Sequence, residues 1–150
     1  MSDDRVFVIV GASLAGARAA AALREGGFEG RIVLIGAETE RPYERPPLSK
    51  GYLLGKDKAE KAYVHGENFY TEQHIELQLG VWATSIDRDA HEVELDNGEH
   101  VHYDKLLITT GSSAIRLGLP GHELAGIHYL RTFAESTELR TALANGGQVV

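Results

Sequence analysis

The stretch VFVIVGASLAGARAAAALREGGFEGRIVLIGAE, residues 6–38, decides the fold of this chain. Residues 6–10 form an apolar run of strand length, and the glycine-containing turn Gly11–Gly16 follows at once. The alanine-rich stretch after it predicts a helix, because alanine has the highest helix propensity. A second apolar run at residues 32–35 leads to Glu38. Strand, glycine turn, helix, strand and acid together form the βαβ pattern of a dinucleotide site.

Each part of this pattern has a chemical role in the expected site. Gly11 lets the chain turn sharply out of the strand, and Gly16 permits close packing of helix and strand. The helix, expected over residues 14–24, directs unpaired N–H groups and its positive dipole end at a pyrophosphate. Glu38 lies at the spacing of an acid that accepts hydrogen bonds from a ribose hydroxyl, about 20 residues on. Ser13 replaces the middle glycine and crowds the phosphate, although its hydroxyl can donate to a phosphate oxygen. The alternative is a buried βαβ unit without a ligand.

Composition restricts the class of protein. The chain has 150 residues, of which 43% are apolar and 25% charged, so we expect a globular domain. A net charge of −7 without a basic cluster argues against nucleic-acid binding. No stretch has membrane-spanning length, and the acidic N-terminus does not resemble a signal peptide, so we expect a cytoplasmic protein without membrane contact. The absence of cysteine excludes a disulfide scaffold, a thiolate metal site and a redox dithiol within these residues.

A proline-rich loop follows the βαβ unit, with the sequence ERPYERPPLSKGYL at residues 40–53. Its prolines fix φ repeatedly and stiffen the chain. Pro47 is expected to open a short helix over residues 48–53. A stiff loop holding Arg45 and Lys50 beside a dinucleotide site is expected to position cations there, whereas the alternative is an ordinary surface turn.

The middle of the chain predicts a short helix at residues 67–74, a sheet strand at 75–79, and then alternation of period two over 81–103. Because Asp96-Asn97-Gly98 supplies a hairpin turn, we expect a three-stranded antiparallel meander inserted between parallel strands. A two-residue hairpin loop would pair Val93 with His102 and Leu95 with His100.

The meander raises two further questions. His100 and His102 share a face, which makes a metal site conceivable, but Asp104 is the only carboxylate expected nearby, so we predict no metal site. Trp82 is expected to be a packing residue rather than a redox participant.

The end of the chain repeats the earlier pattern. Residues 105–110 predict another buried strand, after which the backbone N–H groups of Thr110 and Gly111 would reach a ligand edge. Pro120-Gly121 predicts a turn, and residues 134–144 predict a helix that ends at Asn145-Gly146-Gly147. Gln148-Val149-Val150 reads as the start of an apolar run that opens a second nucleotide-binding unit.

Together these features resemble the FAD domain of the ferredoxin reductases of bacterial oxygenase systems, a putidaredoxin reductase-like and rubredoxin reductase-like group in the pyridine nucleotide-disulfide oxidoreductase superfamily. The resemblance covers the whole chain. It is carried by Gly11–Gly16 with Glu38, by Thr109–Gly111, by Leu130–Thr132 and most specifically by the proline loop Arg41–Lys50.

The resemblance implies an α/β fold: a Rossmann-like FAD-binding parallel sheet with an inserted antiparallel meander. Residues 1–145 would belong to the FAD-binding domain and 146–150 to the start of an NAD(P)H-binding domain. FAD would bind at the first βαβ unit and NADH at the second. These residues alone would bind FAD weakly and expose an apolar sheet edge.

The resemblance also implies roles for single residues. Ala15 would lie at the pyrophosphate, Glu38 at the adenosine ribose, and the backbone of Ala83 at the adenine. Lys50 would approach the isoalloxazine ring, where a cation stabilises negative charge on reduced flavin, and is the catalytic candidate. Arg45 and Pro46 would line the flavin side, and Arg131 would contact the cofactor from the domain junction. The implied cofactor-binding residues are Gly11, Ser13, Leu14, Ala15, Gly16, Glu38, Arg45, Pro46, Lys50, Ala83, Thr110, Gly111 and Arg131.

The implied activity is that of an FAD-dependent NAD(P)H:ferredoxin or rubredoxin reductase. FAD would take a hydride from NADH and pass single electrons to a small redox protein that serves an oxygenase. Related enzymes with a thiol relay carry cysteine where this chain has Pro46–Lys50. The alternatives are a flavin NADH oxidase or peroxide-type reductase, which the missing cysteine disfavours, and a non-catalytic dinucleotide-binding sensor.

Overall fold

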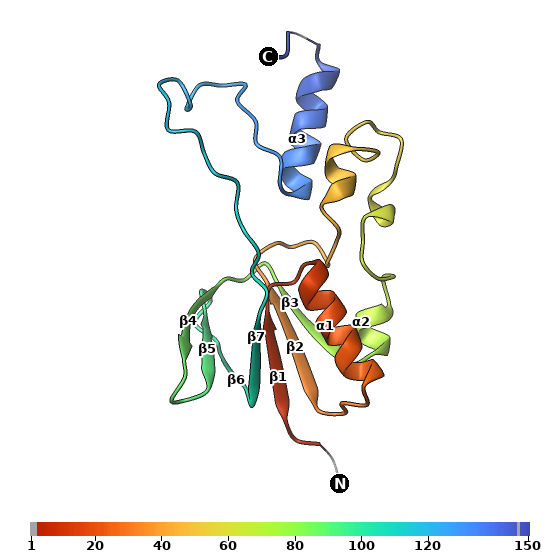
Figure 1. Ribbon diagram of the computed structural model, residues 1–150, viewed down its shortest axis with the longest axis vertical. Helices are drawn as coiled ribbons and strands as arrows, with labels where there is room; N and C mark the ends of the chain where they lie inside the picture. The colour runs from red at the N-terminus through yellow and green to blue at the C-terminus, as the bar shows by residue number, and fades with distance from the viewer. Residues whose placement is uncertain (1–2, 147) are drawn as a thin grey trace. The chain divides into compact units, whose positions relative to one another are not determined.

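The computed structural model describes residues 3–146 and 148–150, which form two compact units (Figure 1). The first, here called the sheet unit, contains residues up to 43 and residues 63–111. The second, the helix unit, contains residues 44–62 and the described residues from 112 onward. Each unit is described by itself.

The sheet unit is built on four parallel strands in the order β3-β2-β1-β7. They are β1 (Val6–Val10), β2 (Arg31–Gly36), β3 (Ile75–Leu79) and β7 (Lys105–Ile108). The central strands β1 and β2 are joined by α1 (Leu14–Glu25), as the opening stretch predicts. Val8 pairs with Val33, and residues 32–35 are at most 1% exposed, as expected for a strand buried on both faces.

Two apolar cores lie on opposite faces of this sheet. Figure 1 shows α1 and the antiparallel strands on different sides of it. One face packs on α1 and on the short helix α2 (Phe69–Glu72), and Ile9, Leu34 and Tyr70 belong to that core. The other face packs on the meander, with Val8 and Val33 in the same core as Val93, Leu95 and Val101. Alternate residues of one strand thus enter different cores, as the pleat of a strand requires.

The meander consists of β4 (Ala83–Asp87), β5 (Glu92–Leu95) and β6 (His100–His102). Its predicted existence and antiparallel pairing are confirmed, but the predicted register is wrong. Val93 pairs with Val101 and Glu94 with His100. The hairpin loop has one residue more than expected, because Leu95 N donates to Glu99 O at 2.9 Å and Gly98 takes a φ of +84°. This register puts the valines on the buried face, which the predicted pairing would not do.

The correct register also changes the surroundings of the histidines. His100 and His102 do share an exposed face, but Glu92 lies there too, and its Oε2 is 3.2 Å from His100 Nδ1. The expectation that Asp104 is the only nearby carboxylate is therefore wrong. No group of three or more potential metal ligands occurs among the residues that the structure describes.

Two expectations about burial are also wrong. Strand β7 was expected to be buried, but it forms one edge of the sheet, and Leu107 and Ile108 are 42% and 57% exposed. This agrees with the expected exposed apolar sheet edge. Trp82, expected to pack, is 64% exposed, because it lies in the connection just before β4 rather than on the inner face of the meander.

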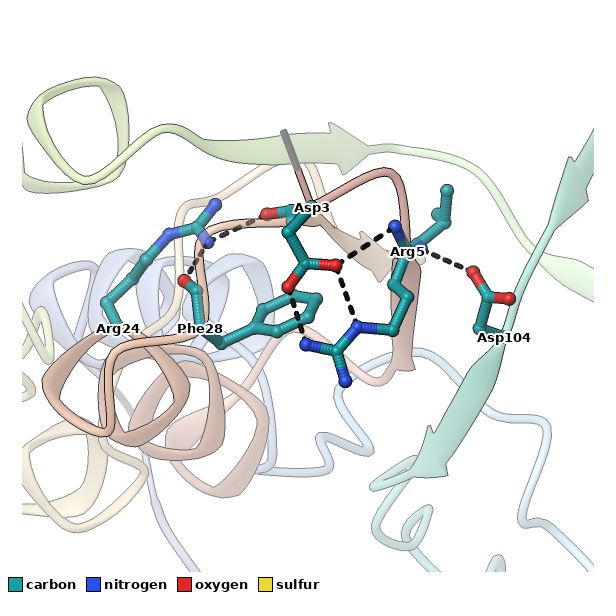
Figure 2. Close-up of polar contacts among 7 residues, drawn as sticks. Asp3, Arg5, Arg24, Phe28 and Asp104 are labelled. Atoms are coloured by element: carbon teal, nitrogen blue, oxygen red, sulfur yellow. Dashed lines mark hydrogen bonds and ion pairs between the residues drawn. The ribbon is translucent and has the colours of Figure 1, made fainter. Parts of the chain in front are cut away.

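The amino ends of the strands are held together by charged side chains (Figure 2). The Arg24 guanidinium donates to four backbone carbonyls, those of Phe28, Gly30, Gln73 and His74, at 2.6 to 2.8 Å. Asp104 accepts from Val6 N at 2.6 Å, and its own N–H donates to Val6 O at 2.8 Å. At one end of the sheet these contacts tie α1 to the start of β3, and β1 to the start of β7.

The helix unit contains the 3₁₀ helices η1 (Pro46–Ser49) and η2 (Ala59–Lys61) and the helix α3 (Phe133–Ala144). The helix expected after Pro47 is shorter than predicted and ends at Ser49. Helix α3 is confirmed, and a reciprocal pair of hydrogen bonds between Thr132 and Glu135 caps its start. The expected turn at Pro120-Gly121 is present, where His122 N donates to Leu119 O.

The last residues bear on the predicted domain boundary. Of the expected stop signal at 145–147, Asn145 caps α3 and Gly146 has a φ of +73°, whereas Gly147 lies outside the described residues. Residues 148–150 contain no assigned strand. The division at residue 145 stays a prediction.

Candidate dinucleotide-binding site

The glycine turn after β1 is built from close backbone contacts. Gly11 has a φ of +119° and donates to Ile35 O at 2.8 Å, and a Cβ here would lie 2.2 Å from Thr109 O. At Gly16 a Cβ would lie 2.1 Å from Gly11 O and 3.0 Å from Leu34 Cδ1. Neither space admits a side chain without movement of the backbone. The turn therefore depends on both glycines, as the sequence pattern predicts.

The N-terminus of α1 opens from this turn. Ser13 is its N-cap residue, with extended φ and ψ of −125° and −163°, and its side chain makes no capping hydrogen bond. The first turn of α1 contains no acidic residue, and Leu14 and Ala15 are exposed. The first N–H groups of a helix have no intrahelical partner. This end of the helix can therefore accept an anionic ligand through its amides.

The ends of β1 and β7 are joined beside the glycine turn. Thr109 N donates to Val10 O at 2.7 Å, and Thr109 Oγ1 donates to Gly11 O at 2.9 Å. Thr110 and Gly111 follow directly and are exposed. Sequence reasoning treated Thr109 only as part of a strand end, although its hydroxyl holds the glycine turn. The position of a threonine at the end of a parallel strand was the sequence signal that could have indicated this role.

Glu38 stands beyond the carboxyl end of β2, beside the connection into the meander. Gly80 N donates to Glu38 O at 3.1 Å, and Val81 N donates to Gly36 O at 3.2 Å. The half-buried Ala83 follows as the first residue of β4. A Cβ at Gly36 would lie 2.5 Å from Ala12 Cβ, so this edge also touches the glycine turn. The structure thus brings Glu38 and Ala83 to the same edge of the sheet as the turn.

Glu38 is held by a residue that sequence reasoning did not single out. The Tyr43 hydroxyl donates to Glu38 Oε2, and the Tyr43 side chain is buried. A second such pair lies next to it, where Tyr63 donates to Glu40 Oε2 at 2.6 Å. Burial and the Glu40 carboxylate raise the pKa of Tyr63 to about 12, so this hydroxyl keeps its proton.

The other predicted residues, Arg45, Pro46, Lys50 and Arg131, belong to the helix unit. Arg45 Nη1 donates to Arg131 O at 2.7 Å, and Arg131 N donates to Glu135 Oε2 at 2.8 Å. A cavity of about 280 Å³ is lined by Arg45, Pro46, Leu48, Ser49, Leu130 and Arg131. Three of the four predicted residues thus meet at one cavity, whereas Lys50 is exposed and is not among its lining residues.

The proline loop is fixed by α3, a contact that the sequence did not reveal. Ser136 is fully buried, and its hydroxyl donates to Leu48 O at 2.7 Å. The Tyr52 hydroxyl lies 2.7 Å from Thr137 Oγ1, and its ring meets Phe133 edge-on at a centroid distance of 4.9 Å. The stiffness expected from the prolines is therefore reinforced by packing.

A parallel sheet with a glycine turn, an uncapped helix N-terminus and an acid at its carboxyl edge defines a dinucleotide-binding protein of the Rossmann type. The chain belongs to the pyridine nucleotide-disulphide oxidoreductase family, whose sequence model matches residues 5–150. The fold class and the family predicted from the sequence are both confirmed.

Similar proteins include reductases of oxygenase systems. The chain is 43% identical over 147 residues to the 3-phenylpropionate/cinnamic acid dioxygenase ferredoxin–NAD(+) reductase component of Photorhabdus laumondii, covering 98% of this chain and 37% of that protein. It is 41% identical to a rubredoxin–NAD(+) reductase of Pseudomonas putida, covering 96% and 37%. The chain therefore spans little more than a third of the length of these relatives.

Solved structures show the same likeness. The ferredoxin reductase for the CYP199A2 system from Rhodopseudomonas palustris matches with a TM-score of 0.89 and 36% identity over 94% of this chain and 35% of that one. A covalent putidaredoxin reductase–putidaredoxin complex matches with a TM-score of 0.83 and 37% identity, covering 93% of this chain and 34% of that one.

Within the described residues, no helix has both the length and the apolar character needed to cross a membrane.

Proposed function

We propose that this chain carries the FAD-binding part of a reductase that passes electrons from NADH through FAD to a ferredoxin or rubredoxin serving an oxygenase. The observation that carries the proposal is the glycine turn, where the backbone approaches too closely for any side chain and α1 presents an uncapped N-terminus. The relatives are named as ferredoxin–NAD(+) and rubredoxin–NAD(+) reductases.

The residues of the sheet unit fit the adenosine diphosphate half of FAD. Under this proposal the amides at Ser13, Leu14 and Ala15 bind the pyrophosphate, because a helix N-terminus stabilises negative charge. Glu38 accepts a hydrogen bond from the ribose, and its charge disfavours a nucleotide with a 2′-phosphate. Gly11 and Gly16 keep the approach open. Ala83 contacts the adenine through its backbone, and Thr110 with Gly111 borders the cofactor.

The helix unit supplies the residues proposed for the flavin half. Arg45, Pro46 and Arg131 line one cavity, and the Arg131 Nε is a buried atom without a hydrogen-bond partner among the described residues. A buried guanidinium nitrogen of this kind suits an anionic or carbonyl-bearing ligand. Lys50 stays the catalytic candidate, as an exposed cation that directly follows the cavity-lining Ser49 in the sequence. Bound FAD would supply the exchange between two-electron and one-electron transfer.

The absence of cysteine restricts how electrons can leave the flavin in the proposed reaction. A relay through thiols cannot run on these residues, so electrons leaving the flavin would go directly to an acceptor. NADH rather than NADPH, the ferredoxin or rubredoxin acceptor and a cytoplasmic location are parts of the same proposal.

The test uses a protein in which this chain is followed by the second nucleotide-binding domain that the resemblance implies, because these residues alone are expected to bind FAD weakly. It is purified and examined for bound flavin. We expect a yellow protein that releases FAD on denaturation, loses its flavin absorbance with NADH, and regains it faster with a ferredoxin than with oxygen. Faster reoxidation by oxygen would favour the oxidase alternative. Bound FAD that NADH does not reduce would favour a sensor, and a protein without affinity for FAD would contradict the proposal.

Glu38→Gln, compared with Glu40→Gln, locates the cofactor. Both changes remove one carboxylate from the segment after β2, and each carboxylate accepts from a tyrosine. We expect Glu38→Gln to weaken FAD binding by about tenfold, since a charged acceptor loses its charge, and Glu40→Gln to leave it unchanged. Equal effects of the two changes would place the ribose elsewhere.

A further inference from the structure

Two acids follow β2, and each is paired with a tyrosine. Tyr43 donates to Glu38 Oε2, and Tyr63 donates to Glu40 Oε2. The two tyrosines are themselves neighbours, because residues 43 and 63 form an isolated antiparallel bridge. Two segments that are separated in the sequence thus meet beside the end of β2 and hold both carboxylates.

The pair that contains Tyr43 is the more firmly fixed of the two. Tyr43 is 3% exposed, whereas Tyr63 is half-buried. The backbone segments that carry the two tyrosines are joined, because Val64 N donates to Pro42 O at 3.0 Å. The Arg41 Cζ also lies over the Tyr63 ring, 3.8 Å from its centroid. A buried ring on a tied backbone cannot swing away. Its hydroxyl therefore fixes one oxygen of the Glu38 carboxylate in space.

We infer that Tyr43 is a positioning residue, which orients the Glu38 carboxylate for hydrogen bonding to the adenosine ribose. This inference rests on the proposed function, because it needs an adenosine at Glu38. A glutamate side chain loses considerable rotamer freedom when a ligand orders it, and a partner that orders it beforehand removes that loss from binding. A carboxylate has about four acceptor positions, so a hydrogen bond from Tyr43 is compatible with one from a ribose hydroxyl.

Positioning and general stabilisation make different predictions. If Tyr43 acts through Glu38 on the ribose, removing the Tyr43 hydroxyl should weaken the binding only of ligands that have the ribose hydroxyl bound by Glu38. If it only stabilises the fold, every adenine dinucleotide is affected alike. The ratio of affinities for FAD and for FAD made with 2′-deoxyadenosine separates the two roles, since both ligands share flavin, pyrophosphate and adenine.

The experiment measures both dissociation constants for the same two-domain protein, as apoprotein, with Tyr43→Phe and with Tyr63→Phe as the matched control. Each change removes one hydroxyl from a tyrosine that donates to a glutamate. We expect Tyr43→Phe to weaken FAD binding by about fivefold and to leave the deoxy ligand unaffected, which lowers the discrimination between them. We expect Tyr63→Phe to preserve that discrimination.

Each other result counts against the inference in its own way. Equal weakening of both ligands by Tyr43→Phe would show a structural role, and unchanged FAD binding would show no role. Wild-type protein that binds FAD without preferring it over the deoxy ligand would overturn the ribose contact, while leaving the proposed flavin function standing. Wild-type protein that binds neither ligand would overturn the proposed function itself.

A second variant covers the case in which Tyr43→Phe fails to fold. Glu38→Asp keeps the charge but shortens the side chain by one methylene, so the carboxylate can no longer be held where the Tyr43 hydroxyl now holds it. We expect this variant to lose the same discrimination against the deoxy ligand. Full discrimination by Glu38→Asp would mean that the carboxylate needs no positioning, and would contradict the inference.

Discussion

The two ends of the parallel sheet are held by different means. At the amino end, side chains with full charges hold backbone groups: Arg24 donates to four carbonyls, and Asp104 accepts from Val6 N. Figure 2 shows the contact of Arg24 with Phe28 and the position of Asp104. At the carboxyl end, Gly11, Gly16 and Gly36 let the chain pack closely, because the nearest atom to an added Cβ would lie only 2.2, 2.1 and 2.5 Å away, respectively. One end is closed by its own hydrogen bonds, while the other leaves amides for a ligand.

This difference teaches where changes should affect binding and where they should affect stability. A parallel sheet binds ligands at its carboxyl end, so substitutions there should alter affinity. Substitutions at the amino end remove hydrogen bonds from the fold and should leave the site of the remaining folded protein intact. The following experiments test this separation, beginning with the largest expected effect.

Gly16→Ala should nearly abolish FAD binding. The new Cβ would lie 2.1 Å from Gly11 O, so the turn that approaches the pyrophosphate must move. We expect affinity to fall by more than about 100-fold and the free energy of unfolding to fall by about 2 kcal/mol, by analogy with overpacking. Titration with FAD and urea denaturation measure these effects.

Gly66→Ala is the control for this substitution. A Cβ at Gly66 meets nothing within 4 Å, and its φ is not in the left-handed region. We expect binding and stability close to those of the unchanged protein. An equally large loss with Gly66→Ala would show that the effect is not specific to the turn.

Arg24→Met should have the largest effect at the amino end. The change keeps an aliphatic side chain but removes the donors to Phe28, Gly30, Gln73 and His74. Hydrogen bonds from charged groups stabilise by about 1.5–3 kcal/mol, and we expect a loss of unfolding free energy in that range. The affinity of the folded fraction for FAD should not change.

The exposed Arg18 on the same helix provides the comparison, because Arg18→Met removes an equal charge without these carbonyl partners. Urea denaturation of both variants measures the difference. Weaker FAD binding by folded Arg24→Met protein would contradict the expectation that the amino end of the sheet affects stability alone.

Asp104→Asn should have a smaller effect of the same kind. Its Oδ2 accepts from Val6 N, and an amide oxygen can still accept there, although without the charge. We expect a loss of about 1 kcal/mol in the free energy of unfolding and no change in FAD affinity. Asp89→Asn, an exposed site in the turn between β4 and β5, is the control. A larger loss for Asp89→Asn would contradict the stabilising role of the Asp104 contact with Val6.

Substitution of His65 should give the smallest effect, which appears only in how the stability of the fold depends on pH. Burial, with a contribution from Arg18, lowers the pKa of His65 below its ordinary value of 6.5. The unfolded chain then binds a proton more readily, so the stability due to neutral His65 is present above pH 6.5. It is lost as the pH falls from there through the lowered pKa.

His65→Gln should flatten this part of the stability curve, whereas His74→Gln, at an exposed histidine, should not. Thermal unfolding between pH 5 and 8 follows both. An unchanged slope in His65→Gln would show that His65 does not set the pH dependence.

Sequence reasoning predicted the opening βαβ unit well because its signals are local. Apolar runs, glycines and alanines lie within one continuous stretch, and β1, α1 and β2 form where they indicate. The hairpin register was missed by one residue, because the choice between Val101 and His102 opposite Val93 depends on burial against the parallel sheet. Composition around the turn does not contain that information.

The candidate site divides in the same way. Gly11, Gly16 and Glu38 could be recognised from spacing, and the structure brings the glycine turn and Glu38 to one edge of the sheet. Tyr43 was visible only as a member of the proline loop, and its hydrogen bond to Glu38 appears once the chain is folded. The anchoring of that loop by Ser136 likewise joins residues that no local pattern connects.

By itself, the sequence determined the order of strands and helices, the need for glycine after β1 and the acid that follows β2, since all of these arise from short-range chemistry. Tertiary structure alone decided the register of the meander, the exposure of Trp82 and β7, the Arg24 contacts and the partner of Glu38. The physical reason is that burial and hydrogen bonds between distant segments depend on which surfaces meet, and a residue's neighbours in the sequence do not specify this.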